Sequence, residues 1–262
     1  MSKSKLIEVV AGVLYNHEGA FLLSSRPEGK PYAGYWEFAG GKVEMGESRL
    51  TALQREFIEE LGIQIQSATP WLTRVHHYEH AHVHLHFFRI AASQWHGQLT
   101  ARENQSWHWQ KPNASTVSPM LPANAPILAA LAIPTAFTGK LKSGFSAKTN
   151  HQLMQIQPYQ ANLSPNTLVF ATASQLPTIS QHHPRSHIWT ICQNRKEWYQ
   201  AQSTAAVIWP LRNQHDRQQL LNLLQQSDIP LPIMVLYTEN YTDDINWMAL
   251  GVHGIIKESE NV

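Results

Sequence analysis

Short apolar runs separated by polar turns characterise the first half of the chain. Leu6–Tyr15 is rich in Val, Leu and Ile, and a polar turn at Asn16–Gly19 separates it from a second apolar run at Ala20–Ser25. Runs of this composition bounded by Gly, Asn or Pro predict β-strands. Further elements expected on such grounds are strands at Pro70–Tyr78, His82–Ala91 and Ser106–Trp109 and a helix at Asn124–Leu131.

A helical spacing begins after Ser48. Apolar residues recur there at steps of three and four, at Leu50, Leu53, Phe57 and Leu61. This periodicity predicts an amphipathic helix from about Arg49 to Leu61. Ser48 is a suitable N-cap, and Gly62 is suited to end the helix.

The predicted helix carries an unusual concentration of carboxylates. Charged residues make up only 15% of the chain, yet Glu56, Glu59 and Glu60 lie at i, i+3 and i+4. Successive helical residues rotate by about 100°, so these side chains share one flank away from the apolar stripe. Like charges at this spacing repel each other. The flank therefore suits a divalent cation such as Mg²⁺ or Mn²⁺, which carboxylate oxygens bind.

The second half of the chain has a different texture. The stretch 134–152 contains TGKLKSGFSAKTN, whose Gly, Ser, Thr and Lys content predicts a linker. Beyond it, strands are predicted at Thr167–Thr172, His187–Cys192, Ala205–Pro210 and Pro232–Tyr237, and helices at Asp216–Gln226 and Tyr241–Leu250. Strands that alternate with helices favour a parallel α/β arrangement.

Length, charge and cysteine content narrow the class of protein. A chain of 262 residues suits two domains, and a net charge of +1 offers no broad attraction for polymeric nucleic acid or membrane. Its single cysteine, Cys192, cannot form an intramolecular disulfide, which fits a cytoplasmic location. The N-terminus lacks the apolar core of a signal peptide, and no membrane span is expected. Composition does not indicate an oligomeric state.

A longer motif surrounds the acidic flank. From Gly41 to Ile63 the chain follows G-x5-E-x7-R-E-U-x-E-E-x-G-U, where U is a bulky apolar residue. This resembles the signature of the Nudix family, the Nudix box. The matching residues are Gly41, Glu47, Arg55, Glu56, Phe57, Glu59, Glu60, Gly62 and Ile63.

The resemblance extends to the MutT-like branch of that family over residues 6–132. It is carried by LIEVVAGVLYNHEGAFLLSSRP, YWEFAGGKVEMGES, GQLTARENQSWHW and PMLPANAPIL. It implies an α+β Nudix fold, a mixed sheet with flanking helices, in a domain over residues 1–133. It also implies a Mg²⁺- or Mn²⁺-dependent pyrophosphohydrolase of a small nucleoside triphosphate. The substrate implied is 8-oxo-dGTP, cleaved to 8-oxo-dGMP and pyrophosphate in nucleotide-pool sanitation.

Two alternatives to that activity stay open. The chain could hydrolyse another nucleotide, or it could be a regulatory protein that senses a small phosphate ligand. The intact glutamates favour an enzyme.

The resemblance also implies roles for individual residues. Metal ligands would be Glu56, Glu59, Glu60, Glu103 and the carbonyl of Gly40. Glu103 is also a candidate general base, and its alternative is an ordinary loop glutamate. Arg55 and Glu47 would orient the carboxylates, while Gly41 permits the turn into the motif. Ala39 stands where the branch often has proline.

Substrate recognition is implied for four residues outside the motif. Asn124 matches a purine-reading asparagine of the branch, and its amide can both donate and accept hydrogen bonds at a purine edge. Alternatively, Asn124 caps the following helix. Arg26 matches a residue near the phosphates. Phe38 matches an aromatic that packs on the base, or it is a core residue. His82 matches the substrate side.

A histidine-rich run, HHYEHAHVHLHFF, occupies residues 76–88. In a strand, His80, His82, His84 and His86 would line one face. Imidazole suits zinc, copper and nickel. Four ligands on one flat strand face rarely make a tetrahedral site, so a half-exposed polar face is expected.

Residues 153–262 resemble a shortened, degenerate thiamine-phosphate synthase. The matching pieces are HIWTICQNRKEWYQAQSTAAVIWPL and LPIMVLYTENYTDDINWMALGVHGII. About 120 residues are too few for a whole eight-fold barrel, so we expect a partial parallel α/β barrel. Thr238 and Glu239 stand where a phosphate-binding glycine pair is expected, so no synthase activity is anticipated. The domain's four tryptophans, Trp189, Trp198, Trp209 and Trp247, are expected in its core.

Overall fold

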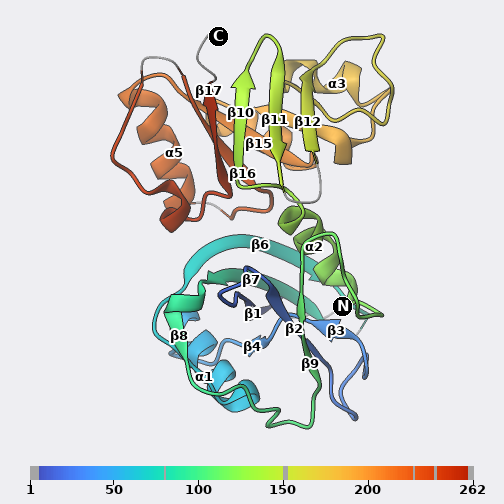
Figure 1. The fold of residues 1–262 in the computed structure, drawn as a ribbon, viewed down its shortest axis with the longest axis vertical. Coiled ribbons are helices and arrows are strands. Elements are labelled where there is room, and N and C mark those ends of the chain that lie inside the picture. Colours follow the sequence, from blue (N-terminus) through green and yellow to red (C-terminus); the bar gives the residue numbers. More distant parts are fainter. Residues whose placement is uncertain (1–5, 80, 150–152, 227, 239–240, 259–262) are drawn as a thin grey trace. The chain divides into compact units, whose positions relative to one another are not determined.

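The computed structural model describes residues 6–79, 81–149, 153–226, 228–238 and 241–258 (Figure 1). The chain divides into two compact units, Met1–Ala132 and Ile133–Val262. Over the described residues, no helix has both the length and the apolar character that crossing a membrane requires.

The first unit is built from two main sheets and two helices. Its elements are β1 (Leu6–Leu14), β2 (Phe21–Ser25), β3 (Trp36–Glu37), β4 (Gly40–Lys42), α1 (Arg49–Leu61), β5 (Gln64–Ile65), β6 (Thr69–His77), β7 (His82–Ile90), β8 (Trp95–His96), β9 (Trp107–Gln110) and α2 (Ala125–Leu131). One sheet has the order β4-β1-β7-β6 and the other β3-β2-β9. Strands β1 and β7 pair parallel, whereas β4 pairs antiparallel with β1 and β6 pairs antiparallel with β7. This confirms the expected mixed sheet with helices.

Helix α1 begins and ends where the sequence predicts. The Ser48 side chain accepts a hydrogen bond from the Thr51 amide, and Gly62 ends the helix in the left-handed conformation at φ 70°. The apolar stripe differs from the prediction at one position. Leu50 is 36% exposed, and Ala52 is buried instead with the other three predicted residues.

The buried stripe of α1 packs on the face of the sheet that carries Val10 and Ile90. Gly12 makes this close approach possible. A Cβ at Gly12 would lie 2.5 Å from the Phe57 ring and 2.8 Å from Ile90. The absence of a side chain on β1 therefore sets how near α1 lies to the sheet.

Gly12→Ala should destabilise the first unit by overpacking this contact. We expect a loss of about 1–3 kcal/mol in free energy of unfolding, because neither ring nor strand has room to move. Urea unfolding of the full chain measures it. Phe57→Leu in the same background should recover part of the loss, and an unchanged transition in Gly12→Ala would contradict the packing argument.

The second unit is a closed barrel of eight strands in sequence order. Its elements are β10 (Ala136–Lys140), β11 (Gly144–Lys148), β12 (Leu153–Pro158), β13 (Val169–Thr172), α3 (Leu176–Ile179), β14 (Ile188–Ile191), α4 (Arg195–Ala201), β15 (Ala206–Leu211), α5 (Gln214–Gln226), β16 (Ile233–Tyr237) and β17 (Gly254–Glu258). The first three strands pair antiparallel, and the remaining pairs, including β10 with β17, are parallel.

Three expectations for this half differ from the structure. The stretch 134–152, expected as a linker, contains β10 and β11, which form a hairpin. The barrel, expected to be partial and parallel, closes with eight strands, because hairpins and short helices replace the long crossovers of a full-size barrel. The helix expected at Tyr241–Leu250 is only a 3₁₀ turn at Trp247–Leu250.

The four tryptophans of the second unit lie in its interior as predicted, each at most 1% exposed. Trp189 meets the Phe137 ring edge-on inside the barrel, with centroids 5.4 Å apart. Large aromatic side chains thus fill the interior of the second unit.

Candidate active site

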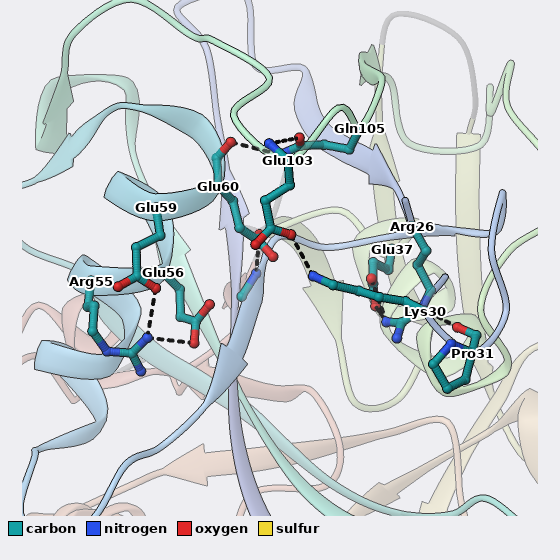
Figure 2. Close-up of polar contacts among 11 residues, drawn as sticks. Arg26, Lys30, Pro31, Glu37, Arg55, Glu56, Glu59, Glu60, Glu103 and Gln105 are labelled. Carbon is teal, nitrogen blue, oxygen red and sulfur yellow. Dashed lines mark hydrogen bonds and ion pairs between the residues drawn. The ribbon is translucent and has the colours of Figure 1, made fainter. Parts of the chain in front are cut away.

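Arg55 is the centre of the acidic flank of α1. Its guanidinium lies 2.8 Å from Glu47. It also lies 2.9 Å from Glu56 and 3.0 Å from Glu59 (Figure 2). It also donates to the carbonyl of Lys42 at 3.0 Å. The hydrogen bonds that Arg55 donates to Glu47, and then those to Glu56, raise the pKa of Arg55 although partial burial opposes them. One arginine therefore orients three carboxylates and joins α1 to β4.

Glu56 lies against the backbone of the segment before the helix. A Cβ at Gly41 would fall 2.2 Å from the Glu56 carboxyl group, so only glycine leaves space for that carboxylate. Burial raises the pKa of Glu56, while Arg55 opposes the shift. Gly41 thus has a specific steric role in holding a partly desolvated carboxylate.

Glu60 is a strongly perturbed carboxylate of the site. One oxygen accepts a hydrogen bond from the Gly40 amide at 3.2 Å. Burial raises the pKa of Glu60 to about 8, and the charges of Glu37 and Glu56 act in the same direction. A group in this position gains from a nearby cation, which would replace both lost hydration and lost counter-charge.

Glu103 reaches the same region from a different segment. Its loop is held at the C-terminal end of α1, where Gln105 donates to the Glu60 carbonyl at 2.7 Å and accepts from the Glu103 amide at 2.8 Å. The Glu103 carboxylate lies 2.5 Å from the ammonium of Lys30. Its charge contributes to the raised pKa of both Glu56 and Glu60. The structure therefore brings together the carboxylates of Glu56, Glu59, Glu60 and Glu103 (Figure 2).

This donor set fits a hard divalent cation. Glu56, Glu60 and Glu103 supply only oxygen atoms, and burial raises the pKa of Glu56 and of Glu60. The Gly40 carbonyl stays a prediction, because the contact observed for Gly40 is through its amide.

Three polar residues of the site were not anticipated. Lys30 lies in a loop with no motif, and Gln105 is an ordinary residue near Glu103. Glu37 forms a partly buried pair with Arg26 at 2.6 Å and adds to the negative charge around Glu60. Only Glu37 had a usable signal, a charge between apolar Trp36 and Phe38.

The residues expected to read the substrate have different surroundings. Besides its pair with Glu37, Arg26 donates to the Pro31 carbonyl at 2.7 Å. Phe38 is 3% exposed and packs between Phe21 and Phe87, as a core residue does.

Asn124 precedes α2 without a capping hydrogen bond from its side chain. Its amide instead contacts the Trp36 carbonyl at 3.4 Å, so the alternative of side-chain capping does not apply.

His82 lies apart from Phe38. It starts β7, and its Nδ1 is 2.5 Å from Nδ1 of His77 on β6. Side chains alternate along a strand, so His82 is on the face opposite Phe87, the residue that contacts Phe38.

The comparison with known families agrees with this arrangement of fold and site. The NUDIX domain family matches residues 5–131, which lie within the first unit. The chain belongs to the Nudix family. Its first unit is a hydrolase acting on a diphosphate linkage. Nudix hydrolases generally use a divalent metal ion, usually Mg²⁺ or Mn²⁺.

Individual relatives match the same half of the chain. A CTP pyrophosphohydrolase of Escherichia coli is 40% identical over 126 residues, 48% of this chain and 91% of that protein. An 8-oxo-dGTP diphosphatase of Haemophilus influenzae is 36% identical over 124 residues, 47% of this chain and 90% of that protein. The solved E. coli ORF135 protein is 38% identical, with a TM-score of 0.42, and covers 49% of this chain and 89% of that one.

The raised pKa of Glu60 predicts how stability depends on pH and metal. Between the ordinary value of 4.5 and about 8, the unfolded chain releases this proton while the folded chain keeps it. Without divalent cations, this group should therefore make the free energy of unfolding fall as pH rises through that window. Mg²⁺ favours the carboxylate and should oppose the fall.

Melting temperatures in EDTA and in Mg²⁺ between pH 5 and 9 test this. The increase caused by Mg²⁺ should grow from pH 6 to pH 8.5, and Glu60→Gln should remove most of that growth. Glu18→Gln, an exposed glutamate of the turn after β1, is the matched control. A Mg²⁺ effect that is the same at every pH would contradict the assignment.

Proposed function

We propose that the chain hydrolyses a nucleoside triphosphate to a monophosphate and pyrophosphate, with 8-oxo-dGTP as preferred substrate. One observation carries the proposal: Glu59 and Glu103, from α1 and a separate loop, add negative charge beside the partly buried carboxylates of Glu56 and Glu60. The names of the relatives, a CTP pyrophosphohydrolase and an 8-oxo-dGTP diphosphatase, support the reaction class.

In the proposed reaction, water adds to the β-phosphorus and the bond to the α–β bridging oxygen breaks. The bridging oxygen leaves with the monophosphate, pyrophosphate carries the water oxygen, and a carboxylate takes the proton. Bound Mg²⁺ would neutralise the phosphates and acidify the water.

Glu56, Glu59 and Glu60 would hold the ion, and Arg55 keeps the first two in place. Glu103 is the candidate base, because its loop can bring it to the water from outside the helix. Lys30, paired with Glu103, places a positive charge where the phosphate chain would arrive.

Substrate choice would depend on residues outside the acidic flank. Arg26 and Asn124 both lie near the segment around Trp36 and Glu37, and Phe38 supports it from the core. The Asn124 amide, 4% exposed, offers a donor and an acceptor for a purine edge. A second candidate substrate is CTP, favoured by the 40% identity with the E. coli enzyme.

Specificity constants across a nucleotide panel decide between these substrates. Purified full-length protein is assayed with 8-oxo-dGTP, dGTP, CTP and dCTP, each with Mg²⁺ and with Mn²⁺. We expect the highest kcat/KM for 8-oxo-dGTP. A higher value for CTP would establish the second candidate, and no monophosphate release from any nucleotide would refute the enzyme assignment.

Glu56→Gln should abolish most of the turnover while leaving the fold intact. Removing one charged ligand should lower kcat at least about 100-fold, since metal ions contribute several kcal/mol to such transition states. Glu18→Gln is the control and should keep full activity. Circular dichroism verifies folding, and normal kcat in Glu56→Gln would refute the metal-site assignment.

Asn124→Ala should alter selectivity rather than the chemical step. We expect kcat/KM for 8-oxo-dGTP to fall roughly 10-fold or more, the effect of a lost buried hydrogen bond of about 1–3 kcal/mol. The value for CTP should change much less. An equal loss for both nucleotides would show that Asn124 is structural.

For the second unit, we propose a non-catalytic role as a degenerate thiamine-phosphate synthase-like scaffold in a cytoplasmic protein. Thr238 stands at one position of the expected glycine pair and donates its hydroxyl to the Leu211 carbonyl at 3.0 Å. Glu239, the other position, lies outside the described residues. A side chain at Thr238 keeps phosphate from the close backbone approach that glycine allows.

A further inference from the structure

A second group of side chains of metal-ligand type lies on the sheet face that α1 covers. Glu8 is on β1, and His84 and His86 are on the parallel neighbour β7, with Glu8 directly opposite His84 in the register. The Glu8 carboxylate contacts Nδ1 of His84 at 3.1 Å and Nε2 of His86 at 2.6 Å. One donor atom from each residue lies within 4.8 Å of the other two.

The pleat explains why polar groups gather at this place. On β7, His84 and His86 share their face with Ile90, and on β1 Glu8 shares its face with Val10. Val10 and Ile90 pack against α1 in the core. The polar trio therefore occupies the end of this face, beneath Arg49 at the first turn of α1.

The trio is separate from the acidic flank. Arg49 and Glu56 are seven residues apart on α1, which is a rise of about 10 Å along the helix. The donor sets also differ in kind, because the flank offers only oxygen while the trio offers two imidazole nitrogens.

The distances suit a tetrahedral transition-metal ion. Zinc binds imidazole nitrogen and carboxylate oxygen at about 2.0–2.2 Å, which places two ligand atoms ~3.3 Å apart. One donor atom of each residue lies within 4.8 Å of the other two, so side-chain rotations can bring the three atoms to this spacing. The two rings already lie side by side, with centroids 4.2 Å apart.

The structure also changes what the histidine run can do. Four histidines on one strand face made a poor site, and His80 lies outside the described residues. Glu8 supplies a donor from the adjacent strand, so the ligands no longer come from one flat row. The side chains of His84 and His86 are 11% and 5% exposed, while that of Glu8 is 38% exposed, which leaves an open side for water.

We propose that Glu8, His84 and His86 form a second metal site that takes a borderline transition ion such as Zn²⁺, with water completing the shell. Arg49, 3.2 Å from Glu8, is displaced when the ion binds. The backbone of Glu8 is held independently of the ion, because its carbonyl accepts a hydrogen bond from the Val43 amide at 2.9 Å. The inference does not rest on the proposed substrate.

Zinc titration of the full chain at saturating Mg²⁺ tests the proposal. Isothermal titration calorimetry should show one Zn²⁺ equivalent that Glu8→Gln and His86→Gln each weaken at least 10-fold. His96→Gln, an exposed histidine of β8, is the control and should bind normally. Equal Zn²⁺ binding by the wild type, Glu8→Gln, His86→Gln and His96→Gln overturns the site. Loss of binding in His82→Gln but not in His86→Gln also overturns it.

A second measurement does not depend on variants folding. Crystals of the wild-type protein grown with Zn²⁺ and Mg²⁺ are measured at the zinc absorption edge. An anomalous peak within bonding distance of Glu8, His84 and His86 supports the proposal. Zinc peaks only at other positions, or none at all, overturn it.

Discussion

The first unit depends on keeping several carboxylates close together on one helix. Glu56 and Glu60 are partly or largely removed from water and carry raised pKa values, so their ionised forms cost free energy in the isolated chain. Arg55 offsets part of that cost through bonds to Glu47, Glu56 and Glu59. One arginine cannot neutralise this number of acids, and the residual negative charge would favour a bound cation.

Steric features around the helix serve the same arrangement. The missing side chain at Gly12 lets α1 lie close to β1, and the missing side chain at Gly41 leaves space for the Glu56 carboxylate. Gln105 ties the loop of Glu103 to the last turn of the helix, so a fourth carboxylate arrives at a fixed place. Packing close to the helix thus determines the electrostatics of the site.

What the sequence predicts well is local. The limits and caps of α1 follow from apolar spacing, Ser48 and Gly62, all within one segment. Lys30 and Glu37 could not be placed beside Glu103 and Glu60, because those contacts depend on how distant segments meet. In the second unit, the sequence predicts a linker where β10 and β11 lie, since glycine and lysine in a short hairpin resemble linker composition. The barrel closes only because of those strands.

Helix α1 places one arginine over each of two acidic centres, and the balance of charge differs between them. Arg49 faces the single carboxylate of Glu8, so charge there is nearly matched, and the remaining hydrogen-bonding capacity comes from imidazole. Arg55 faces several carboxylates and leaves them under-compensated. The uncompensated negative charge at the flank would favour a hard cation. At the trio, an ion must displace Arg49 and would be stabilised mainly by bonds to nitrogen. The same helix can thus support two sites that select different metals by donor type.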